Sequence, residues 1–191
     1  MALLAALVGV ALSCAARSAA ELDRIASALG VQAGMRVADV GAGDGEWTED
    51  LARLVGKQGC VYATEIDEKD VQELRQRMER AGLANVRTLV GNTGDAGLPE
   101  ACCEAILLRM VYHHFTDPPG MRASLRRAPP PPGLIAVIEI EPPASWERPE
   151  GVPERGGPGI PIEDLIAERT GDGFGIVACP DGWGGGARAV G

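Results

Sequence analysis

Three glycines at alternating positions are the first residues of the chain whose type and spacing could bind a ligand. Gly41, Gly43 and Gly45 follow directly on the apolar segment at 35–40. Glycine lacks a Cβ, so a turn built from it lets the backbone approach a ligand closely and adopts positive φ without strain. The spacing is GxGxG, whereas a dinucleotide fingerprint would have its third glycine at position 46, which Glu46 occupies. The turn therefore predicts a ligand site and disfavours NAD.

Two acidic residues accompany this turn. Asp39 precedes Gly41 near the end of a predicted strand, where it could orient the turn or meet a cationic amino group of the ligand, directly or through water. Glu65 ends the next predicted strand, 20 residues after Gly45. A carboxylate at that position can accept hydrogen bonds from both hydroxyls of a ribose. Asp39 is therefore the candidate for contacting an ammonium group, and Glu65 is the candidate for recognising a nucleoside.

Both histidines of the chain, His113 and His114, are adjacent and follow a later apolar segment. Histidine is the side chain whose ordinary pKa suits proton removal near neutral pH, so either residue is a candidate general base. The alternative is that the pair packs and hydrogen-bonds structurally, since adjacent residues need not face the same way. Glu139 and Glu141, near the end of another predicted strand, are rival acids or bases, or side chains that contact only solvent.

These residues need a scaffold, and from residue 21 onward the hydrophobic pattern predicts alternating helices and strands. Short apolar runs typical of buried parallel strands alternate with segments in which apolar residues recur every three or four positions. We therefore expect an α/β domain with a doubly wound, mostly parallel sheet and helices on both faces. Strands are predicted at 35–40, 60–65, 86–90, 105–110, 134–140 and 174–178. Helices are predicted at 22–29, 46–55, 120–128 and around 162–166, and one more between a cap at Asp67 and a terminator at Gly82.

The stretch from about Leu22 to Pro142, nearly two thirds of the chain, resembles the core of class I S-adenosylmethionine-dependent methyltransferases. Residues 37–45 resemble the glycine-rich motif of that family, and residues 61–67 resemble its acidic second motif. Residues 106–115 resemble its fourth-strand motif, in which a buried strand leads to a His-His-aromatic turn near the transferred methyl group. The resemblance implies S-adenosyl-L-methionine as cofactor and methyl transfer to a small-molecule acceptor.

The resemblance also implies roles for two further residues. Gly91-Asn92-Thr93 stands where the family usually has Gly-Asp-Ala, whose polar side chain contacts the adenine amino group. Asn92 replaces the expected acid, and its amide oxygen can still accept that hydrogen bond. Arg109 is expected close to the cofactor. The implied cofactor-binding residues are thus Asp39, Gly41, Gly43, Gly45, Glu65, Asn92 and Arg109.

The chemistry of this cofactor limits what the rest of the sequence must supply. A sulfonium methyl group is already activated, so the protein mainly has to align a nucleophile with it and exclude water, and a dedicated base is optional. Selection of the acceptor would fall to the first helix, the turn at 112–119 and the loop after Pro142. Trp47 and Trp146 are candidate aromatic walls for the acceptor or ordinary packing residues.

The chain departs from the family pattern at two places. Residues 129–133 read Pro-Pro-Pro-Pro-Gly where the family usually has a Lys-Pro-Gly-Gly-like turn. The Gly-rich segment at 181–191 has little strand propensity where the family has the last strand of an antiparallel hairpin, so that hairpin is expected to be incomplete. Three hypotheses remain: an active small-molecule methyltransferase, a degenerate domain that binds the cofactor without catalysis, and a nicotinamide-dependent oxidoreductase.

Composition narrows the partners. With 191 residues, 46% of them hydrophobic, the chain can form one domain with a substantial core. Its formal charge is -9 and it has no run of Lys and Arg that could follow a phosphate backbone, so we do not expect a nucleic-acid partner. The five cysteines form no CxxC pair and have no histidine cluster nearby, so we predict reduced thiols and no metal site.

Residues 2–16 are nearly all apolar and are followed by small residues at 18–20. The segment is typical of an export signal or a membrane anchor, although no basic residue precedes it and its 15 residues are fewer than the roughly 20 of a spanning helix. As an anchor it would hold the domain on the cytoplasmic side, because Arg17 and Arg24 follow it. An ordinary apolar helix, or an extension from a start codon set too far upstream, is the third interpretation. The expected division is a signal-like or anchor-like segment at 1–20, a methyltransferase domain at 21–180 and a Gly-rich tail at 181–191.

Overall fold

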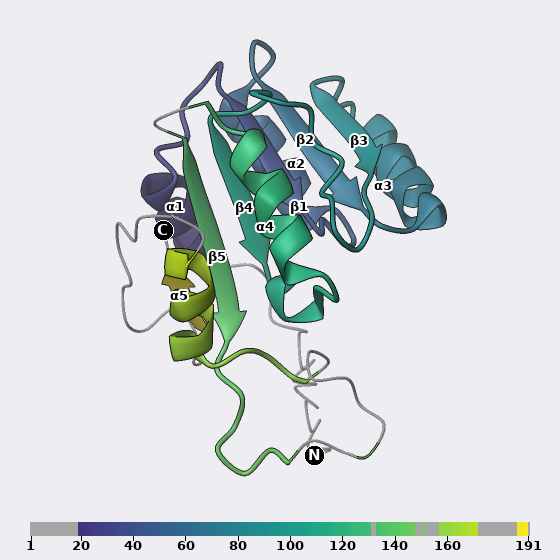
Figure 1. Cartoon of the computed structure of the whole chain (residues 1–191). Coiled ribbons are helices and arrows are strands. Elements are labelled where there is room, and N and C mark those ends of the chain that lie inside the picture. Colours follow the sequence, from purple (N-terminus) through teal and green to yellow (C-terminus); the bar gives the residue numbers. More distant parts are fainter. Residues whose placement is uncertain (1–18, 131–132, 148–149, 151–156, 172–186, 191) are drawn as a thin grey trace, which may run out of the picture.

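The computed structural model describes residues 19–130, 133–147, 150, 157–171 and 187–190, and Figure 1 shows how its elements are arranged. Six strands form one sheet in the order β3-β2-β1-β4-β5-β6. The strands are β1 (Arg36–Val40), β2 (Cys60–Glu65), β3 (Val86–Val90), β4 (Ala105–Arg109), β5 (Leu134–Ile140) and β6 (Ala187–Val190). The helices are α1 (Ala19–Ala28), α2 (Glu46–Val55), α3 (Glu68–Arg80), α4 (Pro118–Arg127) and α5 (Ile162–Gly171), with a short 3-10 turn η1 (Tyr112–His114).

The order of the strands creates a switch point in the middle of the sheet. The chain runs outward from β1 through β2 to β3 and then crosses back to β4, which pairs with the other side of β1. Strands β1 to β5 pair in parallel, so their carboxyl ends meet at one edge of the sheet. In open sheets of this kind, ligands bind in the crevice beyond the carboxyl ends at such a switch point. The predicted doubly wound fold is confirmed.

Side chains on the two faces of the sheet belong to different cores. Alternate residues of a strand point to opposite faces, so Val37 packs behind the sheet while its neighbour Ala38 packs in front. Helices α1 and α2 cover the face of Val37, and α4 and α5 cover the face of Ala38 (Figure 1). α3 packs on the first of these faces, because Leu74 and Met78 contact Ala63 of β2. Helices cover both faces of the sheet, and the carboxyl ends of its parallel strands are left accessible to a ligand.

Side-chain caps fix where two helices begin beyond the strands. The Asp67 carboxylate accepts a hydrogen bond from the backbone N–H of Lys69 at the start of α3, 2.7 Å away. The Asp117 carboxylate does the same for Gly120 at the start of α4, at 3.1 Å, with Pro118 in the first turn. Acceptors at these positions pair N–H groups that a helix cannot pair internally. The loops that precede α3 and α4, both at the ligand edge, therefore end at defined points.

The C-terminal part differs from the expectation. The strand expected at 174–178 lies outside the described residues, whereas Ala187–Val190, in the segment expected to be a tail, forms β6. It pairs antiparallel with Val137–Ile140 of β5. Four residues carry too little pattern to indicate a strand, and the pairing depends on the edge that β5 offers. The apolar segment at 2–16 also lies outside the described residues, and none of the described helices is long and apolar enough to cross a membrane.

Candidate functional site

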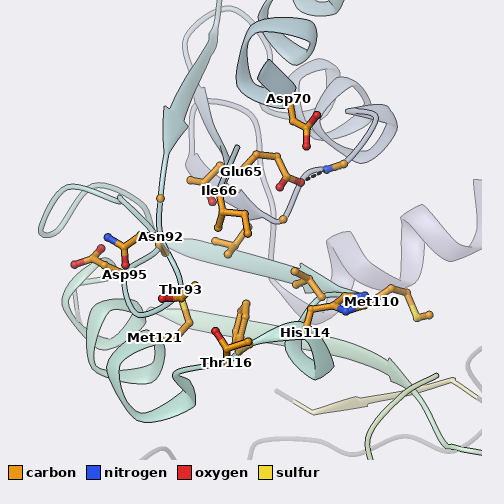
Figure 2. Close-up of a pocket in the computed structure, with 18 residues that line it drawn as sticks. Glu65, Ile66, Asp70, Asn92, Thr93, Asp95, Met110, His114, Thr116 and Met121 are labelled. Carbon is orange, nitrogen blue, oxygen red and sulfur yellow. Dashed lines mark hydrogen bonds between the residues drawn. The ribbon is translucent and has the colours of Figure 1, made fainter. Parts of the chain in front are cut away.

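A cavity of about 450 Å³ lies at the carboxyl ends of β1, β2 and β4 (Figure 2). Its volume falls within the range of about 300–1,000 Å³ that is usual for small-molecule and cofactor sites. Figure 2 shows Glu65 and Ile66 on one side of it and Thr116 and Met121 on the opposite side. Of the residues singled out from the sequence, Gly41, Gly43, Glu65, Asn92 and His114 line the cavity, whereas Asp39, Gly45, Arg109 and His113 do not.

The three glycines of the turn all have positive φ, which is +71° at Gly41, +55° at Gly43 and +82° at Gly45. A Cβ at Gly41 would clash with the side chain of Val111, so the ends of β1 and β4 can approach this closely only with glycine there. A Cβ at Gly45 would likewise clash with Leu74 of α3. At Gly43 nothing lies within 4 Å of a Cβ position. Gly41 and Gly45 are thus required for packing, and Gly43 leaves open space in the cavity.

Glu65 reaches from the end of β2 to this turn. Its Oε1 accepts a hydrogen bond from the backbone N–H of Gly43, with 2.6 Å between the two atoms (Figure 2). The backbone of Glu65 is fixed in turn, because its carbonyl accepts from Gly91 N at 2.8 Å. Oε2 has no hydrogen-bond partner in the described part of the chain. The half-buried carboxylate therefore holds the turn with one oxygen and can accept hydrogen bonds from a ligand with the other.

Asp39 lies beneath the turn and is only 2% exposed. Its Oδ2 accepts a hydrogen bond from the Thr48 hydroxyl at 2.6 Å, which ties β1 to the first turn of α2. Burial raises the pKa of Asp39 to about 6, although the bond from Thr48 acts in the opposite direction. The bond holds together β1 and α2, the two elements that flank the glycine turn, and Asp39 does not line the cavity.

Asn92 lines the opposite part of the cavity from a tight loop after β3. Its Oδ1 accepts a hydrogen bond from Gly94 N at 2.9 Å, and its backbone N–H donates to Asp95 O at 2.8 Å. One lone pair of the amide oxygen is therefore engaged in shaping the loop. Asp95 lines the same cavity and pairs through Oδ2 with Arg127 at 2.9 Å.

Arg109, at the end of β4, faces the first helix. Its guanidinium lies 4.9 Å from the ring centroid of Trp47 and forms an ion pair with Glu21 of α1, 3.0 Å from nitrogen to oxygen. Trp47 itself is 8% exposed and packs in the core between α1 and α2. Neither residue lines the cavity. The contacts of Arg109 with Trp47 and Glu21 hold α1 against the sheet.

The two histidines have different surroundings. His113 is 6% exposed, and its Nδ1 lies 2.6 Å from Oε2 of Glu139, which is itself 3% exposed. The other oxygen of Glu139 accepts the backbone N–H of Tyr112 at 2.6 Å. His114 is exposed at the cavity wall, with its ring 4.0 Å from that of His113 between centroids. Burial, and secondly the neighbouring His113, lower the pKa of His114, so its ring is neutral at pH 7.

The remaining acid considered from the sequence lies apart from this pair. Glu141 is exposed, and its Oε2 accepts a hydrogen bond from the backbone N–H of Ile162 at 3.3 Å. It therefore caps the start of α5. Across the described residues, no group of three or more His, Cys, Asp or Glu side chains could hold a metal ion.

Ile66 and Met110 are among the cavity residues that were not assigned a role from the sequence. Ile66 follows Glu65 and is 63% exposed, unusually so for a large apolar side chain at the rim of a cavity. Its exposure offers an apolar surface to a flat ligand. Met110 has φ of +58°, which is strained for a residue other than glycine, and turns the chain from β4 towards η1. The signal for Ile66 was its place after the acidic strand end, whereas nothing in the sequence indicates the strain at Met110.

Comparison with known proteins also indicates a methyltransferase. Residues 37–131 match the family model described as a methyltransferase domain. The chain is 29% identical over 117 residues to a ubiquinone/menaquinone biosynthesis C-methyltransferase of Marinomonas sp. and 26% identical over 115 residues to a demethylmenaquinone methyltransferase of Geobacillus stearothermophilus. These matches cover 61% and 60% of this chain and 47% and 49% of those proteins, so the chain spans about half the length of these relatives.

Solved structures show the fold independently. A methyltransferase from Aquifex aeolicus, described as dependent on S-adenosylmethionine, superposes with a TM-score of 0.76 at 24% identity, covering 88% of this chain and 87% of that one. An S-adenosylmethionine-dependent O-methyltransferase from Thermotoga maritima superposes with a TM-score of 0.64 at 18% identity, covering 92% and 64%. At these identities the likeness establishes the fold.

Proposed function

Residues 37–131 of this chain form a domain of the class I S-adenosylmethionine-dependent methyltransferase family, and on this premise we propose that the protein transfers the methyl group of S-adenosylmethionine to a small-molecule acceptor. The observation that carries the proposal is the contact between Glu65 and Gly43 at the rim of the cavity. It brings the acidic end of β2 against the one glycine of the turn that leaves open space. This is the arrangement that a nucleoside lying across the strand ends requires.

The residues of the cavity fit this ligand. We propose that Glu65 accepts hydrogen bonds from the ribose hydroxyls, that Gly43 gives the backbone approach, and that Ile66 and Met121 provide the apolar surface for adenine. Asn92 is proposed to meet the adenine amino group with the remaining lone pair of its amide oxygen. Asp39 and Arg109 are proposed to act indirectly, by holding the turn and α1 in place.

The charge of the cavity supports a cationic ligand over a dinucleotide. Its described lining includes the acids Glu65, Asp70 and Asp95, the last of which is paired with Arg127, and contains no Lys or Arg. The neutral ring of His114 adds no positive charge at pH 7, since its pKa is lowered. A sulfonium group is attracted by such a wall, whereas the two negative charges of a pyrophosphate would be repelled. This supports S-adenosylmethionine over NAD on grounds independent of the glycine spacing.

The chain's own contribution to methyl transfer is alignment and exclusion of water. S-adenosylmethionine, when bound, supplies a methyl group already activated by the sulfonium. Val111, Phe115 and Met121 line the cavity with apolar surface that keeps water from the reacting atoms. The strained backbone at Met110 places Val111 and His114 at the wall where β4 ends. Holding donor and acceptor in line converts a bimolecular step into an effectively unimolecular one.

We propose a small acceptor rather than a nucleic acid. The formal charge of -9 would repel a phosphate backbone, and no run of Lys and Arg offsets it. The experiment is to incubate the full chain with S-adenosylmethionine carrying a labelled methyl group and with amines, phenols, thiols and carbon acids in turn. Labelled product and stoichiometric S-adenosylhomocysteine with one class are expected. If the cofactor binds but none of the acceptor classes gives a labelled product, the result would favour the alternative of a degenerate domain that binds the cofactor without catalysis.

A further inference from the structure

A second cavity, of about 680 Å³, adjoins the histidine pair. His113 lines this cavity and His114 lines the first, with 4.0 Å between their ring centroids. The remaining walls come from the loop after β5 and from α5, and include Trp146, Asp164 and Glu168. Resting on the proposed function, we infer that this second cavity binds the methyl acceptor and that the acceptor is a small organic amine, recognised as its ammonium form.

The charges around this cavity select the class of acceptor. Asp164 and Glu168 are the carboxylates of its described lining, and no Lys or Arg is among those lining residues. Glu168 is already compensated, because its Oε2 pairs with Arg122 at 2.9 Å and accepts from the Tyr112 hydroxyl at 2.8 Å. An anionic acceptor therefore finds no cationic partner on this wall, whereas an ammonium finds the carboxylate of Asp164.

An aromatic side chain lines the same cavity as that carboxylate. Trp146 lines the cavity, and its ring packs against Gly157, where a Cβ would lie 2.8 Å from Cη2 of the indole. The glycine therefore lets the ring settle in a fixed position. An ammonium group is attracted to the face of tryptophan through the ring quadrupole, most strongly where water is excluded. Carboxylate and indole together form a site for a cation.

A buried nitrogen that has no hydrogen-bond partner within the described part of the chain points to the same ligand. In the tautomer that carries its proton on Nδ1, His113 donates to the Glu139 carboxylate across 2.6 Å, and Nε2 is then the acceptor nitrogen. Nε2 has no hydrogen-bond partner among the described residues, although His113 is only 6% exposed. Buried polar groups nearly always have partners. An N–H of an ammonium in the second cavity would supply this one.

The arrangement gives the histidine a step in the reaction. The ammonium N–H transfers its proton to Nε2 of His113, and Glu139 stabilises the imidazolium that forms. The freed nitrogen lone pair forms the new bond to the methyl carbon while the carbon–sulfur bond breaks, its electron pair staying on sulfur. The products are the methylated ammonium, which takes over the positive charge of the sulfonium, and S-adenosylhomocysteine with an uncharged sulfur, and the proton on His113 passes to solvent.

Calorimetry on the full chain tests the class of acceptor. The protein is first titrated with S-adenosylhomocysteine and then, saturated with it, with phenethylamine, 2-phenylethanol and 3-phenylpropionate, which share a skeleton and differ in charge. The same series on a butyl skeleton guards against a mismatch in shape. We expect the amine to bind at least about 10-fold more tightly than the alcohol or the acid on one skeleton. Equal or tighter binding of the alcohol or the acid on both would overturn the inference.

Matched variants locate the binding. Asp164→Asn and Trp146→Leu should each weaken amine binding at least about 5-fold, while Glu163→Gln, which removes a charge from an exposed neighbour on the same helix, should not. Unchanged binding in both variants would show that the amine is elsewhere. If the native protein does not bind S-adenosylhomocysteine but still prefers the amine, the result counts against the proposed function and not against the second cavity. If it binds S-adenosylhomocysteine but shows no preference for the amine, the result counts against the second cavity alone.

The role of His113 has its own readout. His113→Gln should lower turnover with the amine at pH 7 by at least about 10-fold, and the deficit should shrink as the pH approaches the amine's own pKa of about 10. A purely structural histidine would leave a deficit that does not change with pH, and that result would remove the proton-transfer step.

Discussion

The carboxylate of Glu65 and the backbone amide of Gly43 are joined by a hydrogen bond of 2.6 Å, although they come from different strand ends 22 positions apart in the chain. This bond forms the corner of the candidate site. It fixes one carboxylate oxygen, leaves the other towards the cavity and keeps the unsubstituted face of Gly43 open.

Replacing Glu65 should weaken cofactor binding without unfolding the protein. Glu65→Ala removes a carboxylate whose charge-assisted hydrogen bonds are worth about 1.5–3 kcal/mol each, so we expect S-adenosylhomocysteine affinity to fall about 10- to 100-fold. Thermal unfolding should show a native-like transition. The control is Glu68→Ala, an exposed glutamate of α3 that does not line the cavity. Equal affinities for all three proteins would remove Glu65 from the ribose site.

A methyl group at Gly43 should weaken ligand binding beyond the strain that it adds to the fold. Gly43→Ala places a Cβ in open space in the cavity and strains a residue with φ of +55° by about 1–2 kcal/mol. Gly30→Ala introduces comparable strain at φ of +60°, also with nothing within 4 Å, but away from the cavity. Both variants should lose similar stability in urea, and only Gly43→Ala should lose affinity. A loss of affinity in both variants, or in neither, would mean that the open face of Gly43 does not contact the ligand.

Asp39 should make stability depend on pH in an unusual direction for an acid. Burial raises the pKa of Asp39 from its ordinary value of 3.8 to about 6, so the fold favours the protonated form. Its contribution is full below pH 3.8 and is lost as the pH rises through about 6. This rise in pKa corresponds to up to about 3 kcal/mol of unfolding free energy.

The measurement for Asp39 is urea unfolding between pH 4 and pH 7. Asp39→Asn should remove that part of the pH dependence, whereas Asp23→Asn, at an exposed position of α1, should keep it. A variant whose unfolding free energy follows the native pH profile would show that Asp39 keeps an ordinary pKa in the fold.

His114 should distinguish the charged cofactor from its neutral product at low pH. Its pKa is lowered below the ordinary 6.5, so it becomes cationic only in more acidic solution, where it would repel a sulfonium. We expect affinity for S-adenosylmethionine to fall relative to S-adenosylhomocysteine as the pH drops from 7 to 5, by roughly 10-fold. His114→Gln should reduce this difference, and the part that persists should disappear with Asp39→Asn, because Asp39 loses its negative charge in the same range. A ratio independent of pH in the native protein would place the sulfonium away from both.

The sequence predicts this fold well where pattern and local chemistry agree. Four elements begin and end at the predicted residues, namely β2, β3, β5 and α2. Their apolar runs are bounded by polar residues and glycines, which define both ends of each element. β6 could not be predicted, because Ala187–Val190 becomes a strand only through the edge of β5. Element order along the chain therefore sufficed for the parallel part of the sheet.

The site was predictable in part for a similar reason. The glycines and Glu65 can be identified from the sequence, because a glycine turn after one strand together with an acid at the end of the next strand is typical of a nucleoside site. The pairing of His113 with Glu139, 26 positions apart, and the stacking of Arg109 on Trp47 depend on how strands and helices pack. No spacing rule connects such residues, so sequence left both histidines as equal candidates.

The central claim is that the cavity binds S-adenosylmethionine, and calorimetric titration of the full chain with S-adenosylhomocysteine and, separately, with NAD tests it most directly. The neutral product reports the adenosyl site without turnover, and the acidic wall should exclude the pyrophosphate. We predict saturable binding of S-adenosylhomocysteine at one site per chain and no heat with NAD. Binding of NAD without binding of S-adenosylhomocysteine would contradict the account.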